Sequence, residues 1–219
     1  MSLLTEIEVR VLGSLIEKEI TTPEYYPLTL NALTIACNQK NNRNPVTAYT
    51  ENEVEEALNG LREKNLAYVF HGSTSRVPKF KHVAAEVLKL APPELAVMCS
   101  LMLSGAQTVG EIRTRASRMH SFVDLEEVEE TLRLLTTKEP DPMVVRLPRQ
   151  AGQKEARFAQ LLAGEPQVDQ LATEELVPKT ARRAPDTERV EKLEQQIEVL
   201  ATQIEDLRVQ FEKFRKQFD

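Results

Sequence analysis

The same pattern of hydrophobic and polar positions occurs twice along this chain. An apolar helical pattern opens each half, formed by Val9, Val11, Leu12, Leu15 and Ile16 in the first and by Leu95, Val97, Met98, Leu101 and Met102 in the second. Residues 53–61 then return in near-copy as residues 127–135. Because both near-copies follow their apolar helix, the pattern indicates two copies of one helical unit.

A hairpin signal follows each near-copy. Strand-like residues 66–70 and 77–81 flank a polar turn, and residues 143–147 and 155–158 flank a turn that contains Gly152. Three helices followed by a two-stranded hairpin is the order of a winged helix-turn-helix. We therefore predict a mainly α-helical chain with small β-hairpin wings, built as tandem winged helix-turn-helix domains at residues 1–90 and 91–165.

Helix boundaries in the first half can be predicted from capping residues. Thr5 followed by Glu8 is a capping box, so the first helix should begin near Thr5. Two prolines predict a loop at residues 21–27, and the second helix should span residues 28–38. The third helix should begin at Thr50.

The C-terminal part has a different composition. Residues 166–187 are rich in Glu, Pro and Thr and are expected to form a linker. From residue 188 to 219 apolar residues alternate three and four positions apart, which predicts a coiled-coil helix and a homodimer through it. The alternative is that this helix folds back onto its own domains. The seam residues are Val190, Leu193, Ile197, Leu200, Ile204, Leu207, Phe211, Phe214 and Phe218.

Charge and composition exclude several classes of protein. The net charge of the 219 residues is −6, so any anionic partner must be met by a local basic patch. No apolar run approaches the ~20 residues that a membrane span needs, and we expect a cytoplasmic protein with no membrane contact. Cys37 and Cys99 each fall within an apolar helical stretch and are expected to be core thiols.

Catalysis finds little support in the pattern of reactive side chains. The three histidines, His71, His82 and His120, are isolated from any ligand or nucleophile at a useful spacing. A phosphate-binding Gly-rich loop is also lacking from the sequence. We therefore predict that the chain is not an enzyme and uses no cofactor or metal.

The outward faces of the two predicted third helices are acidic. At 100° per residue they carry Asn52, Glu56, Asn59 and Glu63 in the first half and Glu126, Glu130, Arg133 and Thr137 in the second. Carboxylates in these positions would oppose contact with phosphates. Any DNA contact should therefore use the loops and wings.

Cations and amides gather outside the third helices. Such side chains can hold phosphates without reading a base sequence. The alternative for the arginines near the end of the second copy's middle helix is that they complement the helix dipole. The candidate nucleic-acid or partner-binding residues are Asn38, Gln39, Lys40, Asn42 and Arg43 after the second helix, Arg113, Arg115 and Arg118 in the second half, and Arg76, Lys79, Arg149 and Lys154 in the wings.

Several longer motifs are more specific than the winged-helix pattern. They are residues 10–19 (RVLGSLIEKE), 21–33, 36–40 (ACNQK), 147–150 (LPRQ) and 152–157 (GQKEAR). In these motifs, residues 3–166 resemble the YceH family of bacterial proteins. The resemblance implies two winged-helix domains, and it supplies no reaction, ligand or catalytic residue.

Two functions follow as expectations. The first is a cytoplasmic, non-enzymatic regulatory protein that binds DNA through the loops and wings of tandem winged helices. The second is a protein–protein adaptor that uses the same domains without direct DNA contact, which suits an acidic third helix and a dimerising tail.

Overall fold

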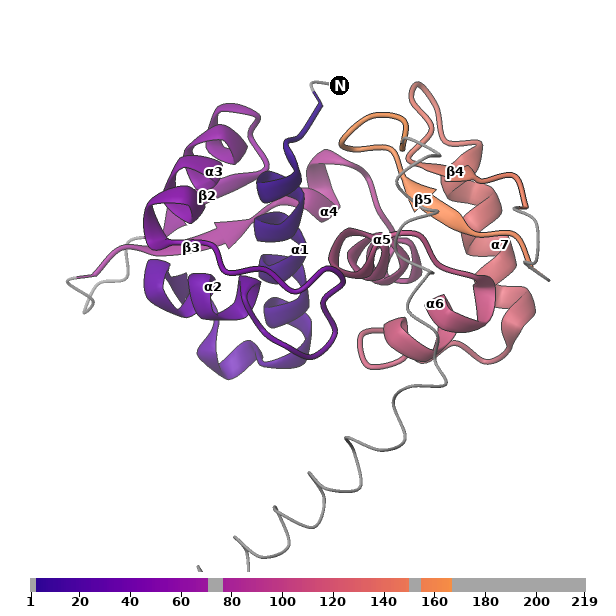
Figure 1. Ribbon diagram of the computed structural model, residues 1–219, viewed down its shortest axis with the longest axis horizontal. Coiled ribbons are helices and arrows are strands. Elements are labelled where there is room, and N and C mark those ends of the chain that lie inside the picture. The colour runs from indigo at the N-terminus through magenta and orange to yellow at the C-terminus, as the bar shows by residue number, and fades with distance from the viewer. Residues whose placement is uncertain (1–2, 71–76, 150–154, 167–219) are drawn as a thin grey trace, which may run out of the picture. The chain divides into compact units, whose positions relative to one another are not determined.

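The computed structural model describes residues 3–70, 77–149 and 155–166 (Figure 1). Arg76 and Lys154 of the predicted wings, residues 167–187 of the predicted linker and the heptad residues 190–218 lie outside the described residues. The described residues belong to one compact unit.

The first helix begins where its capping residues predict. Helix α1 spans Glu6–Thr21, and the Thr5 Oγ1 accepts a hydrogen bond from the Glu8 amide at 3.2 Å, while the Glu8 carboxylate accepts one from the Thr5 amide at 2.7 Å. A short 3₁₀ helix, η1 (Pro23–Tyr25), occupies the predicted loop. The two hydrogen bonds between Thr5 and Glu8 pair backbone amides that the start of α1 would otherwise leave unpaired.

The second helix is shorter than the predicted span of residues 28–38. Helix α2 covers Leu30–Cys37, and β1 (Leu28–Thr29) precedes it. The reason is that Leu28 pairs with Phe80 of a later strand, while the Thr29 side chain caps α2 through the Ala32 amide at 3.3 Å. The predicted start of the helix was therefore wrong by two residues.

A third helix and a hairpin complete the first half. Helix α3 spans Glu51–Glu63 with Thr50 as its cap, as predicted. Strands β2 (Ala67–Phe70) and β3 (Lys79–His82) form an antiparallel sheet with β1 in the order β1-β3-β2. Helix α4 (Ala84–Val87) then leads into the second half.

The second half repeats this order. It contains α5 (Pro92–Ser104), α6 (Val109–Ala116), α7 (Leu125–Thr136), β4 (Val144–Arg146) and β5 (Phe158–Gln160). An antiparallel bridge between Gln107 and Phe158 stands where β1 stands in the first half. The last strand was predicted at residues 155–158 and instead spans 158–160, because Val144 pairs with Gln160.

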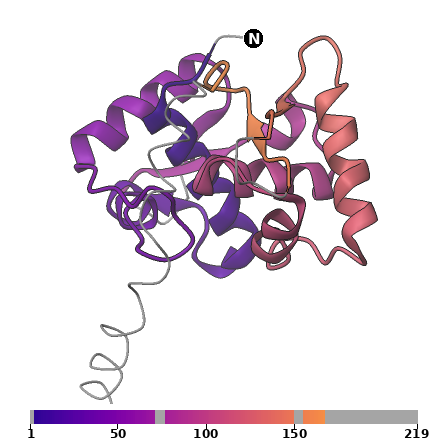
Figure 2. The same ribbon diagram turned by 45° about the vertical axis from the view of Figure 1, so that its right-hand side comes forward.

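Helices α1 and α5 pack against each other and join the two halves. A Cβ added to Gly13 of α1 would lie 3.0 Å from Leu103 Cδ2 and 3.1 Å from Met102 Cβ of α5, so any larger residue would require these side chains to shift. One hydrophobic cluster runs through both halves as a result. Helices α3 and α7 lie on opposite sides of the α1–α5 pair in both views (Figures 1 and 2).

The described part of the chain is mainly helical with two small antiparallel sheets. This composition and the order of helices and strands are consistent with a winged-helix-like fold. Within the described residues, no helix is both long enough and apolar enough to cross a membrane.

Candidate interaction site

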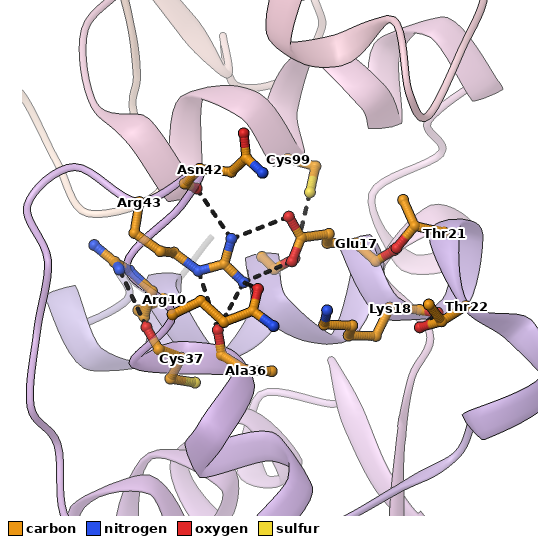
Figure 3. A network of polar contacts seen from close by, with 12 residues as sticks. Arg10, Glu17, Lys18, Thr21, Thr22, Ala36, Cys37, Asn42, Arg43 and Cys99 are labelled. Carbon is orange, nitrogen blue, oxygen red and sulfur yellow. Dashed lines mark hydrogen bonds and ion pairs between the residues drawn. The ribbon is translucent and has the colours of Figure 1, made fainter. Parts of the chain in front are cut away.

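Arg43 is not the solvent-facing cation that the Asn-rich loop predicts. Its side chain is buried, and its guanidinium forms a two-pronged ion pair with Glu17 of α1, with Nη2–Oε2 at 2.6 Å and Nη1–Oε1 at 3.0 Å (Figure 3). The same guanidinium donates to the backbone carbonyls of Ala36 and Asn42. The Arg43 guanidinium is therefore engaged by groups of the protein itself, with its side chain buried.

Glu17 is bound from the second half of the chain as well. Arg118, which follows α6, pairs with the same carboxylate from the solvent side. Burial alone would raise the pKa of the Glu17 carboxyl, but hydrogen bonds and charge from Arg43 and Arg118 outweigh it, so this pKa lies below its ordinary value. The three side chains therefore form an ionic link between the two copies of the repeat.

A second buried arginine lies beside this link. Arg10 of α1 donates to the Pro45 carbonyl at 2.7 Å and to the Cys37 carbonyl at 3.3 Å. Burial, followed by the nearby charge of Arg43, lowers the pKa of Arg10. Both arginines therefore serve to hold the loop after α2 against α1.

The amide residues of the loop also have internal partners. The Asn38 side chain accepts from the Tyr49 amide at 2.8 Å and donates to the Tyr49 carbonyl at 2.7 Å, which closes the loop before α3. Gln39 accepts weakly from Arg43 at 3.4 Å. Asn42 has a φ of 57° and supplies the carbonyl described above, while Lys40 is exposed. Of the five predicted loop residues, only Lys40 keeps a charge directed to solvent.

The remaining predicted cations are scattered. Arg113 donates to the Val123 carbonyl at 3.0 Å and thereby fastens the turn before α7. Arg115 of α6 and Lys79 of β3 are half-buried, and Arg149 is exposed. Within the described part of the chain, Arg113 alone of these four cations donates a side-chain hydrogen bond to the backbone of a neighbouring turn.

Helix α3 presents an acidic surface, as the sequence predicts. Its exposed charged residues are Glu51, Glu53, Glu55, Glu56, Arg62 and Glu63, five carboxylates against one guanidinium. The predicted outward residues Asn52 and Asn59 are exposed beside them. In duplex DNA recognition by winged helices this helix meets the major groove, so its charge decides whether phosphates are attracted or repelled.

Helix α7 has the same character. Glu126, Glu129 and Glu130 are exposed, and the single cation of this helix, Arg133, is held by Glu130 with Nη2–Oε1 at 2.5 Å. Hydrogen bonds and charge from Arg133 lower the pKa of Glu130. The Arg133 guanidinium therefore neutralises the charge of Glu130 and leaves the charges of Glu126 and Glu129 uncompensated on this helix.

Exposed apolar side chains lie on α2 and at the start of α7. Ile35 of α2, for which the helical pattern allowed burial, is 60% exposed, and Ala36 is buried in its place. At the start of α7, Val123 is 81% exposed and Leu125 is 47% exposed. Single exposed apolar side chains are normal on protein surfaces, so these residues do not by themselves mark an interface.

Cys37 and Cys99 are free and buried, as predicted. Burial raises the pKa of each thiol, so both thiols stay protonated at neutral pH. Among the described residues, no group of three or more His, Cys, Asp or Glu side chains is placed to hold a metal ion.

Comparison with known proteins places the chain in a family. The family described as "Protein of unknown function, DUF480" matches residues 4–153. The chain belongs to this family. A UPF0502 protein of Geotalea daltonii is 58% identical over 180 residues, which cover 82% of this chain and 80% of the relative. A UPF0502 protein of Vibrio campbellii is 46% identical over 194 residues, which cover 87% and 88% of the two chains.

Proposed function

We propose that this member of the DUF480 family is a non-enzymatic regulatory protein that acts as a protein–protein adaptor. In this account residues 1–90 and 91–165 are two winged-helix domains, and α3 and α7 provide the contact surfaces for a basic partner. The observation that carries the proposal is the excess of exposed carboxylates on α3, five against one guanidinium. Such a surface attracts cationic protein surfaces and repels a phosphate backbone.

The fate of the loop cations supports the same proposal. Arg43, Arg113 and Arg118 are three of the arginines expected to hold phosphates, and each is bound to an acceptor within the protein. Moving the Arg43 guanidinium out to solvent would leave the buried Glu17 carboxylate without this ion-pair partner, which costs several kcal/mol. On this proposal the loop after α2 has a structural role, and the exposed carboxylates of α3 and α7 are the charged groups that meet a partner.

DNA binding is the second candidate, favoured by the order of the elements. Helix, strand, helix, helix and hairpin is the order in which winged helices present a third helix to the major groove. On this account Lys40, Lys79 and Arg149 would supply the phosphate contacts that do not depend on base sequence.

A fluorescence-anisotropy titration with duplex DNA at several salt concentrations separates the two functions. The adaptor account expects no saturable binding of the full chain even at low salt. DNA binding would instead weaken with salt, and the Lys40→Ala variant would lower the slope of log K against log salt by about 0.9 for one lost phosphate contact. Glu56→Gln with Glu63→Gln is the matched control, because loss of duplex binding in that variant would mean that α3 contacts bases.

A further inference from the structure

A cavity of about 620 Å³ lies where the two copies of the repeat meet. The end of α3 and the residues that follow it line one side, and residues 138–143 after α7 line the other. Val87, Leu88 and Met143 supply apolar wall, and the last two are buried. In Figure 1, α4 lies between α3 and β4 at this place. The volume is within the range of cavities that hold small molecules.

Two lysines at equivalent positions of the repeat line this cavity. Lys64 and Lys138 each follow the third helix of their copy, 74 residues apart. The Lys64 ammonium lies 2.5 Å from the Glu8 carboxylate, and the Lys138 ammonium lies 3.0 Å from the Glu94 carboxylate. The Glu8 and Glu94 carboxylates also accept hydrogen bonds from the backbone amides of Thr5 and Ala91, at the starts of α1 and α5.

Each ion pair joins a lysine of the cavity lining to a glutamate outside that lining. Lys64 and Lys138 belong to the lining, whereas Glu8 and Glu94 do not and have nearly buried side chains. An ammonium has three hydrogen-bond donors, and the carboxylate engages one of them. Each lysine therefore keeps further donors that its glutamate does not engage.

Lys89 adds a third ammonium to the lining in an unusual backbone conformation. It lies two residues after the end of α4 and has a φ of 52°, and the Leu90 amide donates to the Ala85 carbonyl at 2.9 Å across this turn. This is the position at which helices most often place glycine, because other side chains are strained there. Lys89 thus adds a third basic residue to the lining at a backbone position that glycine would occupy without strain.

Three carboxylates restrict the class of ligand. Glu63, Glu139 and Asp141 also line the cavity, and all three are exposed, so their charges act through solvent. They disfavour a polyanion, while the apolar wall favours a ligand with a hydrocarbon part. We propose that this cavity binds a small amphipathic anion, whose carboxylate or phosphate group is held by Lys64, Lys89 and Lys138 and whose apolar part contacts Leu88 and Met143.

The proposal can be tested with the full chain labelled with ¹³C at its methionine methyl groups. Met143→Leu identifies the Met143 resonance. Titration with octanoate or octyl phosphate should shift this resonance saturably, and the comparison shows which anionic group is preferred. Octylamine, which has a similar hydrocarbon part and the opposite charge, should not. Equal shifts with octylamine, or no saturable shift with either anion, would overturn the proposal.

A variant at the strained position tests the role of charge without damage to the fold. Lys89→Gly removes the ammonium and relieves the positive φ, so the protein should remain folded. Its affinity for the preferred anion should fall about threefold or more, the effect of losing one partly exposed charge contact. Lys40→Ala removes an exposed lysine elsewhere and should leave the affinity unchanged. Equal affinities of the Lys89→Gly variant and the unchanged chain would contradict the assignment.

Discussion

Cys99 donates its thiol hydrogen to the backbone carbonyl of Gly13 at 3.3 Å, and the two residues occupy the same position in the two copies of the repeat, 86 residues apart. Equivalent residues of α1 and α5 therefore touch where these helices cross. The raised pKa of the buried Cys99 thiol keeps it protonated and able to donate. The first helix of each copy of the repeat, α1 and α5, thus also forms the interface that joins the two copies.

Gly13→Ala should destabilise the protein by about 1–3 kcal/mol, because the added methyl group would press on Leu103 and Met102. Gly110→Ala in α6 is the matched control, since a Cβ there meets nothing within 4 Å. That control should be neutral or stabilising by up to ~1 kcal/mol, as alanine favours helix. Urea denaturation of both variants measures the difference, and equal stabilities would contradict close packing at Gly13.

Glu17→Gln should cost about 3–5 kcal/mol of unfolding free energy, because it leaves Arg43 buried without a charged partner. Glu130→Gln removes an exposed partner of Arg133 and should cost less than about 0.5 kcal/mol. Chemical denaturation at neutral pH compares the two variants. Similar costs for both would mean that the buried ion pair contributes no more than a surface pair.

The same carboxylate should contribute to stability in a pH-dependent way. Because the pKa of Glu17 is lower in the folded protein than in the unfolded chain, its contribution is complete above the ordinary glutamate pKa of about 4.3. The contribution is lost as the pH falls through the lower folded value. The stability gap between the unchanged chain and Glu17→Gln should therefore narrow as the pH falls from 5 toward 3. A constant gap over this range would contradict the lowered pKa.

Local signals in the sequence predicted the parts of the fold that depend on neighbouring residues. The Thr5 capping box and the helix start at Thr50 were predicted because such signals lie within one helical turn, and the acidic face of α3 follows from the spacing of its apolar residues. The role of Arg43 was missed because Glu17 lies 26 residues away, and Arg118 meets the same carboxylate from 101 residues away. A run of amides and cations is therefore predicted to be a solvent-exposed surface when the buried carboxylate that binds it is distant in the sequence.

Self-association is predicted to depend on the C-terminal heptads. A chain ending at Pro166 retains every described residue and should remain folded. It should sediment as a monomer, whereas the full chain should sediment as a dimer, because the a and d positions from Val190 to Phe218 would form the contact. Sedimentation equilibrium on both chains gives the answer. Equal dimerisation of the shortened chain would assign the contact to residues 1–166 instead.

The adaptor account is tested most directly by site-specific photo-crosslinking in living cells, with a photoreactive side chain in place of Asn52 on the exposed face of α3. The same position in a chain that also carries Glu56→Lys and Glu63→Lys is the matched control. We predict covalent adducts to protein that disappear in the charge-reversed control, since the carboxylates attract the partner. Adducts to nucleic acid at this position, or protein adducts that persist after charge reversal, would contradict the account.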